Sequence, residues 1–503
     1  MEHDPLLIDR LRDDLMAAGY GVAGVEEVLG TVAADALHRE EPVPALRATE
    51  GSGEPVAVLV RTFLLGSAVP VRRLERAFRT LGVAGAVALG LVELDGDDVR
   101  ALVDLRPYAA VDGGGEVDWW IASDLGELAT GRALRTDHVL GVGGASTTLA
   151  QVTVRDPRAL VLDLGTGCGI QALHASRHSR RVIGTDISRR ALEFARFNAL
   201  LAAVPLELRA GSMLEPVADE HVDLVVSNPP FVITPRTPDM PAYEYRDGGR
   251  SGDAIVRELV EGVGAVLAPG GVAQLLGNWE VRRGEDWHER VGSWLDASGL
   301  DGWVVQRELQ DPAQYAETWI RDGGTTPDRD RDAWAARYGS WLDDFASRDV
   351  EGIGFGFLTL RKPVAGAPTL RRLEEATGSV RQPLGPVIAA SLAAHDWLEF
   401  HDDEGLLAAH LAVAPDVTEE RYLTPGDPDP QVVLLRQGGG FGRAVQAGTA
   451  LAGFVGACDG DLSVGQIVNA LGALLDVGAD AVAADVLPSA RGLIRDGLLL
   501  PSS

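Results

Sequence analysis

Residues 161–170 read Val-Leu-Asp-Leu-Gly-Thr-Gly-Cys-Gly-Ile, an apolar strand that opens into a glycine-rich turn and then into a helix. Glycine lets the backbone pass close to a bound ligand at the carboxyl end of a parallel strand. A dinucleotide-binding turn needs glycine at its sixth position, where this chain has Ile170. Glycine occupies the first, third and fifth positions instead, at Gly165, Gly167 and Gly169. The stretch therefore predicts a ligand-binding turn of a different kind.

Around this turn, short apolar runs alternate with helical segments from about residue 119 to residue 363, which is typical of an α/β fold with a parallel sheet covered by helices. We expect seven strands, at residues 159–164, 181–186, 206–210, 222–227, 271–276, 303–309 and 352–360. The aromatic residues of the insertion at 310–351 predict a helical cover packed on the sheet, and a substrate wall is the alternative.

The flanking regions predict two smaller helical domains. Residues 1–118 have helical spacing followed by a hairpin around the Asp-Gly turn at 95–98, and residues 364–503 end in two helices and a strand. Both patterns are winged-helix-like, but the acidic hairpin turn would repel a phosphate backbone. We expect three domains, at residues 1–118, 119–363 and 364–503, with docking or packing roles for the outer two.

A carboxylate and an amide follow two further predicted strands. Asp186 ends the strand after the glycine turn, where it can accept both hydroxyls of a ribose or cap the next helix. Residues 223–231 then read Asp-Leu-Val-Val-Ser-Asn-Pro-Pro-Phe. Together, the two motifs resemble those of the class I S-adenosylmethionine-dependent methyltransferases, which have a Rossmann-like domain. The resemblance covers about residues 135–362.

This resemblance implies S-adenosyl-L-methionine as the cofactor. The cofactor-binding residues that it implies lie on the glycine turn and at the ends of the second, third and fourth strands: Asp163, Gly165, Thr166, Gly167, Gly169, Asp186, Ile187, Ser212, Met213 and Asn228. Related enzymes often carry an acid after the third strand, where this chain has Ser212. Whether Ser212 contacts the adenine is left open.

The Asn-Pro-Pro-Phe form resembles the branch that methylates planar nitrogens, and it implies three catalytic residues. The side-chain oxygen of Asn228 and the backbone carbonyl of Pro229 can accept the two N–H bonds of an NH2 group and aim its lone pair at the methyl carbon. Phe231 would supply a flat apolar wall that excludes water.

The segment at residues 243–253, which contains Asp-Gly-Gly, is similar to a stretch of the glutamine N5-methyltransferases that modify peptide chain release factors. Those enzymes usually carry tyrosine in place of Phe231. The overall layout, including residues 137–148, also looks like a group of actinobacterial methyltransferases. We expect an enzyme that methylates a glutamine side chain of a protein. The alternatives are methylation of adenine N6 or guanine N2 in RNA or DNA, and a non-catalytic cofactor-binding interaction module.

Composition narrows the choice of partner and compartment. The formal net charge of −29 disfavours wide contact with nucleic acid. No apolar run is long enough to cross a bilayer, and two distant cysteines, Cys168 and Cys458, favour a soluble protein in the reducing cytoplasm. The histidines lack metal-ligand spacing, so we expect no metal site, and we expect Cys168 to be a small buried space-filler. The sequence does not indicate the oligomeric state.

Overall fold

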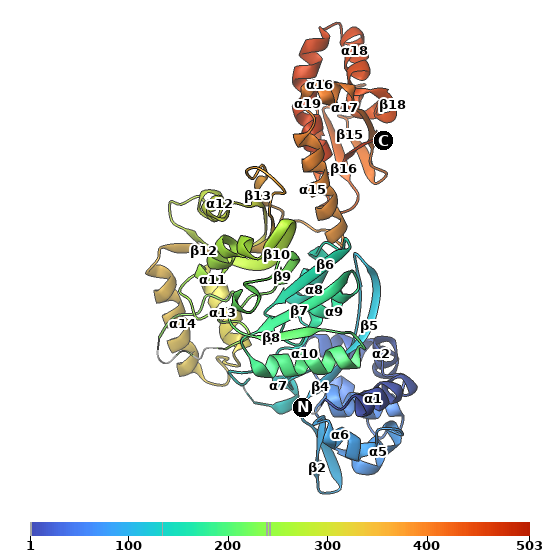
Figure 1. Ribbon diagram of the computed structural model, residues 1–503, viewed down its shortest axis with the longest axis vertical. Helices are drawn as coiled ribbons and strands as arrows, with labels where there is room; N and C mark the ends of the chain where they lie inside the picture. The colour runs from blue at the N-terminus through green and yellow to red at the C-terminus, as the bar shows by residue number, and fades with distance from the viewer. Residues whose placement is uncertain (1–2, 133, 238–239, 241–242, 503) are drawn as a thin grey trace. The chain divides into compact units, whose positions relative to one another are not determined.

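A computed structural model describes residues 3–132, 134–237, 240 and 243–502 (Figure 1). The chain forms two compact units. Unit 1 contains Met1–Ala150 and Pro157–Glu375, and unit 2 contains Gln151–Asp156 and Ala376–Ser503. The short segment Gln151–Asp156 thus belongs to the unit that is completed at the end of the chain.

A mixed sheet forms the centre of unit 1, in the order β13-β11-β12-β10-β9-β6-β7-β8. Its strands are β6 (Arg158–Leu164), β7 (Ser179–Asp186), β8 (Glu207–Ala210), β9 (Val222–Ser227), β10 (Leu267–Arg282), β11 (Asp301–Gln310), β12 (Val350–Arg361) and β13 (Arg371–Glu375). Strands β6 to β10 run parallel, whereas β12 is antiparallel to both of its neighbours. The sheet has the Rossmann-like α/β architecture that the sequence predicts.

The predicted count of seven strands is wrong, because the sheet has eight. The seven predicted strands are present, and β13 adds an eighth at the edge, where it pairs with β11. Its sequence, Arg-Arg-Leu-Glu-Glu, lacks the apolar alternation by which a strand is recognised. An edge strand with one pairing partner needs little apolar surface, and β13 is accordingly half-buried or exposed along its length.

Helices cover both faces of the sheet (Figure 1). Helices α11 (Ala254–Gly262) and α12 (Trp287–Ser298) share one apolar cluster with side chains of β6, β9 and β10. Helices α9 (Ile170–Ser176) and α10 (Arg189–Leu201) share another cluster with the N-terminal helices. The first cluster therefore packs α11 and α12 on the sheet, and the second packs α9 and α10 against the N-terminal region.

The N-terminal part of unit 1 is helical and ends in two hairpins. Its helices are α1 (Pro5–Ala17), α2 (Val22–His38), α3 (Val43–Ala48), α4 (Pro55–Leu59), α5 (Val71–Ala77) and α6 (Gly82–Ala88), and its strands are β1 (Val69–Pro70), β2 (Val92–Asp95), β3 (Asp98–Ala101), β4 (Asp104–Asp112) and β5 (Gly115–Ser123). The β2–β3 hairpin forms around the predicted turn, and β1 completes a three-stranded sheet. The longer β4–β5 hairpin was not expected, although Asp112-Gly113 is a hairpin-turn signal.

Two further helices, α7 (Glu127–Thr130) and α8 (Gly144–Val152), lead into β6. The insertion between β11 and β12 contains α13 (Pro312–Asp322) and α14 (Arg331–Ala346). Tyr315, Trp341 and Phe345 of this insertion pack with Ile233 and Ile353, so it covers the sheet and the segment after β9.

Unit 2 combines helices with two small sheets. The helices are α15 (Gly385–Glu399), α16 (Asp403–Ala408), α17 (Thr449–Gly456), α18 (Val464–Leu474) and α19 (Ala479–Arg495), and the strands are β14 (His410–Val413), β15 (Val417–Tyr422), β16 (Val432–Gln437), β17 (Ala444–Ala447), β18 (Asp459–Ser463) and β19 (Leu499–Pro501). Ser463 begins α18 with a capping box to Gln466. In the part of the chain that the structure describes, no helix has both the length and the apolar character needed to span a bilayer.

Candidate functional site

The register of three parallel strands brings the predicted site residues together. Leu164 at the end of β6 pairs with Thr185 of β7 on one side and with Ser227 of β9 on the other. The Ser227 hydroxyl also donates a hydrogen bond to the Leu164 carbonyl at 2.8 Å. Gly165 and Asn228 directly follow β6 and β9, and Asp186 is the last residue of β7. All three therefore occupy the same edge of the sheet.

A cavity of about 760 Å³ opens at this edge. The predicted residues that line it are Asp163, Gly165, Thr166, Gly167, Asp186, Ile187, Ser212, Met213, Asn228 and Pro229. Cavities of about 300–1,000 Å³ are typical of small-molecule and cofactor sites. The structure therefore gathers most of the residues that the sequence singles out around one space of suitable size.

Asp163 stabilises the conformation of the glycine turn through hydrogen bonds. This buried carboxylate accepts hydrogen bonds from the Thr166 hydroxyl at 2.6 Å and from the Ala172 amide at 2.9 Å. Burial raises the pKa of Asp163 from 3.8 to about 7, against the opposing effect of these hydrogen bonds. Gly165 and Gly167 have φ angles of +72° and +54°, and a Cβ on either would meet no atom within 4 Å. The turn therefore presents bare backbone to open space.

Asp186, at the end of β7, contacts the glycine turn directly. Its carboxylate accepts hydrogen bonds from the amides of Gly167 at 3.0 Å and Ser188 at 2.8 Å. Burial raises its pKa, and the charge of Glu244 acts in the same direction. Asp186 thus touches the glycine turn and the start of α10, which accommodates both of its predicted roles.

Asn228 and Pro229 present oxygens at the tip of β9. The side-chain Oδ1 of Asn228 is buried and has no hydrogen-bond partner. The Pro229 carbonyl accepts a hydrogen bond from the Phe231 amide at 2.7 Å, which fixes its direction. A carbonyl oxygen has two lone pairs, so this one retains the capacity for a second donor.

Gly169 and Phe231 lie outside the set of residues that line the cavity. A Cβ on Gly169 would meet Ala195 at 3.2 Å, so this glycine permits close approach of the turn to α10. The Phe231 ring packs edge-on against Phe355, with ring centroids 6.5 Å apart. Phe231 therefore contacts the core beside the cavity.

Two loops that strand patterns do not reveal complete the cavity. Residues 137–141 line one part and the acceptor segment, defined here as residues 243–250, lines another through Glu244, Tyr245 and Asp247. The Glu244 amide donates to the Thr136 carbonyl at 2.9 Å, and the Tyr245 ring lies 6.0 Å from that of His138. The resemblance of the Asp-Gly-Gly stretch is the sequence signal that points to the second loop.

Asp247 anchors the acceptor segment beside the tip of β9. It forms an isolated antiparallel bridge with Phe231, and its Oδ1 accepts from Arg236 at 2.5 Å and from the Gly249 amide at 3.1 Å. Its Oδ2 is buried without a hydrogen-bond partner. The cavity wall near Asn228 therefore contains a second oxygen that can accept a hydrogen bond.

Cys168 and the other potential metal ligands contribute no recognised reactive centre. Burial raises the pKa of the Cys168 thiol to about 12, so it is protonated at neutral pH. Across residues 3–132, 134–237, 240 and 243–502, no group of three or more His, Cys, Asp or Glu side chains is arranged to hold a metal ion.

The part of the chain that contains this site matches the model of a known protein family. A model described as methyltransferase small domain matches residues 141–285. Two other models, each described as a domain of unknown function, match residues 17–102 and 389–501.

Curated relatives match about a quarter of the chain. The release factor glutamine methyltransferase of Geobacter sulfurreducens is 35% identical over 122 residues, which cover 22% of this chain and 43% of that protein. The protein of the same name from Mycolicibacterium smegmatis is 37% identical over 134 residues, or 24% and 46%. The chain thus spans about half the length of these relatives.

Among solved structures, a SAM-dependent methyltransferase from Thiobacillus denitrificans in complex with S-adenosyl-L-homocysteine is 20% identical, with a TM-score of 0.25, and the match covers 43% of this chain and 89% of that chain. The family model and the curated relatives carry the assignment. The chain contains a class I S-adenosylmethionine-dependent methyltransferase domain, which resembles that of the release factor glutamine methyltransferases over part of their length.

Proposed function

We propose that this protein transfers a methyl group from S-adenosylmethionine to the side-chain nitrogen of a glutamine in a protein. The observation that carries the proposal is the register that places Asn228, with its unpartnered buried Oδ1, beside Gly165 at the edge of one cavity. The names of the curated relatives support glutamine as the acceptor.

The residues around the cavity fit the cofactor. Bare backbone at Gly165 and Gly167 leaves room for a ligand to lie against the turn. Asp186 would hold the ribose hydroxyls, while Ile187, Ser212 and Met213 would enclose the adenine side. S-adenosylmethionine supplies an electrophilic methyl carbon, so the protein's task is to position the acceptor.

Asn228 and Pro229 would orient the acceptor nitrogen. An amide nitrogen is a poor nucleophile because its lone pair is delocalised into the carbonyl group. If Asn228 Oδ1 and the Pro229 carbonyl accept its two N–H bonds, the lone pair is directed away from both oxygens and the developing positive charge is stabilised. The hydrogen bond from Phe231 holds the Pro229 carbonyl in place during this step.

A protein acceptor agrees with the charge of the molecule. The net charge of −29 and the acidic β2–β3 turn, which contains Asp95, Asp97 and Asp98, disfavour a phosphate backbone as the binding partner. We infer that the winged-helix-like outer regions dock protein. We also propose a cytoplasmic location, supported by the two free and buried cysteines.

The test is incubation of the protein with methyl-tritiated S-adenosylmethionine and a cell lysate that is then separated into protein, RNA and DNA. We expect label in the protein fraction, on the side-chain nitrogen of glutamine after digestion. Asn228→Ala should lower the rate by at least about a hundredfold, as loss of a transition-state contact in other enzymes does, while the dissociation constant for S-adenosylmethionine changes little.

Asn469→Ala serves as the matched control, because Asn469 is exposed on α18 and its side chain contacts only the Gly465 carbonyl. Undiminished labelling by Asn228→Ala would remove this residue from the catalytic role. Label in RNA or DNA would replace the glutamine acceptor with a base, and label in no fraction would favour a non-catalytic cofactor-binding module.

A further inference from the structure

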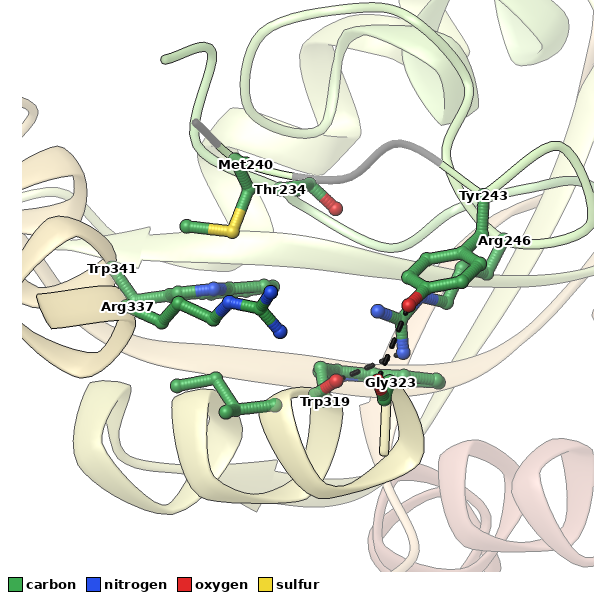
Figure 2. Close-up of a pocket in the computed structure, with 9 residues that line it drawn as sticks. Thr234, Met240, Tyr243, Arg246, Trp319, Gly323, Arg337 and Trp341 are labelled. Atoms are coloured by element: carbon green, nitrogen blue, oxygen red, sulfur yellow. Dashed lines mark hydrogen bonds between the residues drawn. The ribbon is translucent and has the colours of Figure 1, made fainter. Parts of the chain in front are cut away.

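A second, much smaller pocket is lined in part by Tyr243 and Arg246 of the acceptor segment (Figure 2). Its volume is about 10 Å³, which is about the minimum for one water-sized group. The residues that line it are Thr234, Met240, Tyr243, Arg246, Trp319, Ile320, Gly323, Arg337 and Trp341. None of the predicted site residues is among them.

The pocket is surrounded by hydrogen-bond donors that have no partner. Four polar atoms of its lining are buried and unpartnered: Thr234 Oγ1, Arg246 Nε, Trp319 Nε1 and Trp341 Nε1. The residues Thr234, Arg246 and Trp341 are 4%, 6% and 1% exposed. Buried polar groups in folded proteins are almost always paired, so a cluster of four unpaired ones indicates that something else satisfies them.

The charge of the lining is positive. Figure 2 shows the guanidinium groups of Arg246 and Arg337 on opposite sides of the pocket, with the Thr234 hydroxyl above them. Arg246 pairs with Asp322, which lies outside the lining, whereas the Arg337 guanidinium donates to the Thr325 hydroxyl and has no carboxylate partner among the described residues. Among the lining residues that the structure describes, none carries a negative charge.

These observations distinguish an anion from a water molecule. A water molecule accepts only two of the four bonds on offer, so two buried donors would stay without a partner. A monatomic anion needs no acceptors, and it can receive all four donors at once.

We propose that this pocket is a binding site for a small monatomic anion, of which chloride is the abundant example. Arg246 and Tyr243 face this pocket, while Tyr245 and Asp247 of the same segment line the large cavity. An anion bound by Thr234 and Arg246 would therefore stabilise the position of the acceptor segment, whose other side chains line the large cavity.

The test measures chloride binding directly, by broadening of the chloride NMR signal at constant ionic strength, with gluconate as the non-binding anion. We expect excess broadening with the wild-type protein, and bromide should abolish it by competition. Trp341→Phe and Thr234→Val each remove one donor, so each should weaken chloride binding by about tenfold. The matched control is Trp334→Phe, whose indole lies on α14 but does not line the pocket.

A crystal grown in bromide supplies a second measurement that does not depend on a variant. An anomalous peak within the pocket supports the proposal, and density bonded as water without an anomalous peak overturns it. Equal broadening by Trp341→Phe, Thr234→Val and the wild-type protein also overturns it. None of these measurements requires methyl transfer, so failure of the anion site and failure of the proposed function are separate results.

Discussion

At the scale of single residues, Asp163 shows how a buried carboxylate can shape the glycine turn that lines the cavity. It is 1% exposed and accepts two hydrogen bonds that shape the glycine turn. Burial raises its pKa to about 7, so folding strengthens its hold on a proton. Unfolding therefore releases that proton between about pH 4 and pH 7, and the free energy of unfolding should fall as the pH rises through this window.

Asp163→Asn tests this linkage. Asparagine keeps an oxygen for Thr166 and Ala172 but carries no charge, so the variant should lose about one proton of pH dependence between the unfolded pKa of 3.8 and the folded pKa of about 7. Urea unfolding at several pH values measures the difference. If wild type and variant show parallel curves from pH 4 to pH 7, Asp163 does not have the raised pKa.

Much of the site could be predicted at this scale because it follows the ends of strands. Asp186 and Asn228 each end or follow an apolar run, and parallel strands bring their carboxyl ends to one edge. The Phe231 side chain packs on Phe355, because the segment after Pro230 pairs with Asp247 through a contact distant along the chain. No local pattern reveals such a pairing.

At the scale of secondary-structure elements, Asn198 joins three of them. This fully buried side chain on α10 accepts from the Ala122 amide at 2.8 Å and donates to the carbonyls of Ala122 and Cys168 at 2.9 and 2.8 Å. It therefore ties α10 to β5 and to the glycine turn. The spacing of apolar residues cannot predict this contact, since a buried polar residue breaks that spacing.

Asn198→Ala should destabilise unit 1 by about 2–4 kcal/mol, because it leaves three buried backbone groups without partners. Asn469→Ala should change the stability by less than about 0.5 kcal/mol, since Asn469 is exposed. Chemical denaturation of both variants gives the comparison. Equal stabilities would mean that water replaces the Asn198 side chain.

Tyr315 has a corresponding role between the insertion and the site. Its buried hydroxyl accepts hydrogen bonds from the Ile233 amide at 3.0 Å and from Asn278 Nδ2 at 2.7 Å. Tyr315→Phe should cost about 1–3 kcal/mol through two unpaired donors. In a thermal melt, Tyr338→Phe is the control, because its hydroxyl makes only long contacts of 3.4 and 3.3 Å. A melting temperature as high for Tyr315→Phe as for the control would contradict this role.

The elements themselves were predictable where apolar periodicity is strong, as in the strands from β6 to β12. The missed elements have other causes. The side chains of β13 are mostly charged, because β13 lies at the edge of the sheet and has one pairing partner. In β4 and β5, which form a two-stranded hairpin, apolar residues lie on both faces, so no regular alternation results.

At the scale of the whole molecule, the boundary between the two units crosses the chain three times. The Leu384 amide donates to the Gln151 carbonyl at 2.9 Å, and a Cβ on Gly385 would meet the Thr153 carbonyl at 2.1 Å. Val152 and Val154 are each 1% exposed. The sequence predicts three contiguous domains, and a six-residue segment that joins a unit remote in sequence carries no compositional signal.

A chain that ends at Glu375 should therefore be less soluble than the full chain and should bind a hydrophobic dye, because the buried Val152 and Val154 belong to the unit whose other residues this truncation removes. Replacement of both valines by serine should restore solubility to the shortened chain and destabilise the full one. A soluble shortened chain that binds no dye would show that the segment packs equally well without unit 2.

The segment Gln151–Asp156 also sets an order of events during synthesis. It leaves the ribosome before every strand of the central sheet, whereas residues 376–503 of its unit are translated after all of them. The nascent protein must therefore keep two buried valines uncovered while the Rossmann-like region folds. Any pause in translation after Glu375 would prolong the exposure of these two valines. A chaperone that binds apolar peptide segments could then bind at Gln151–Asp156.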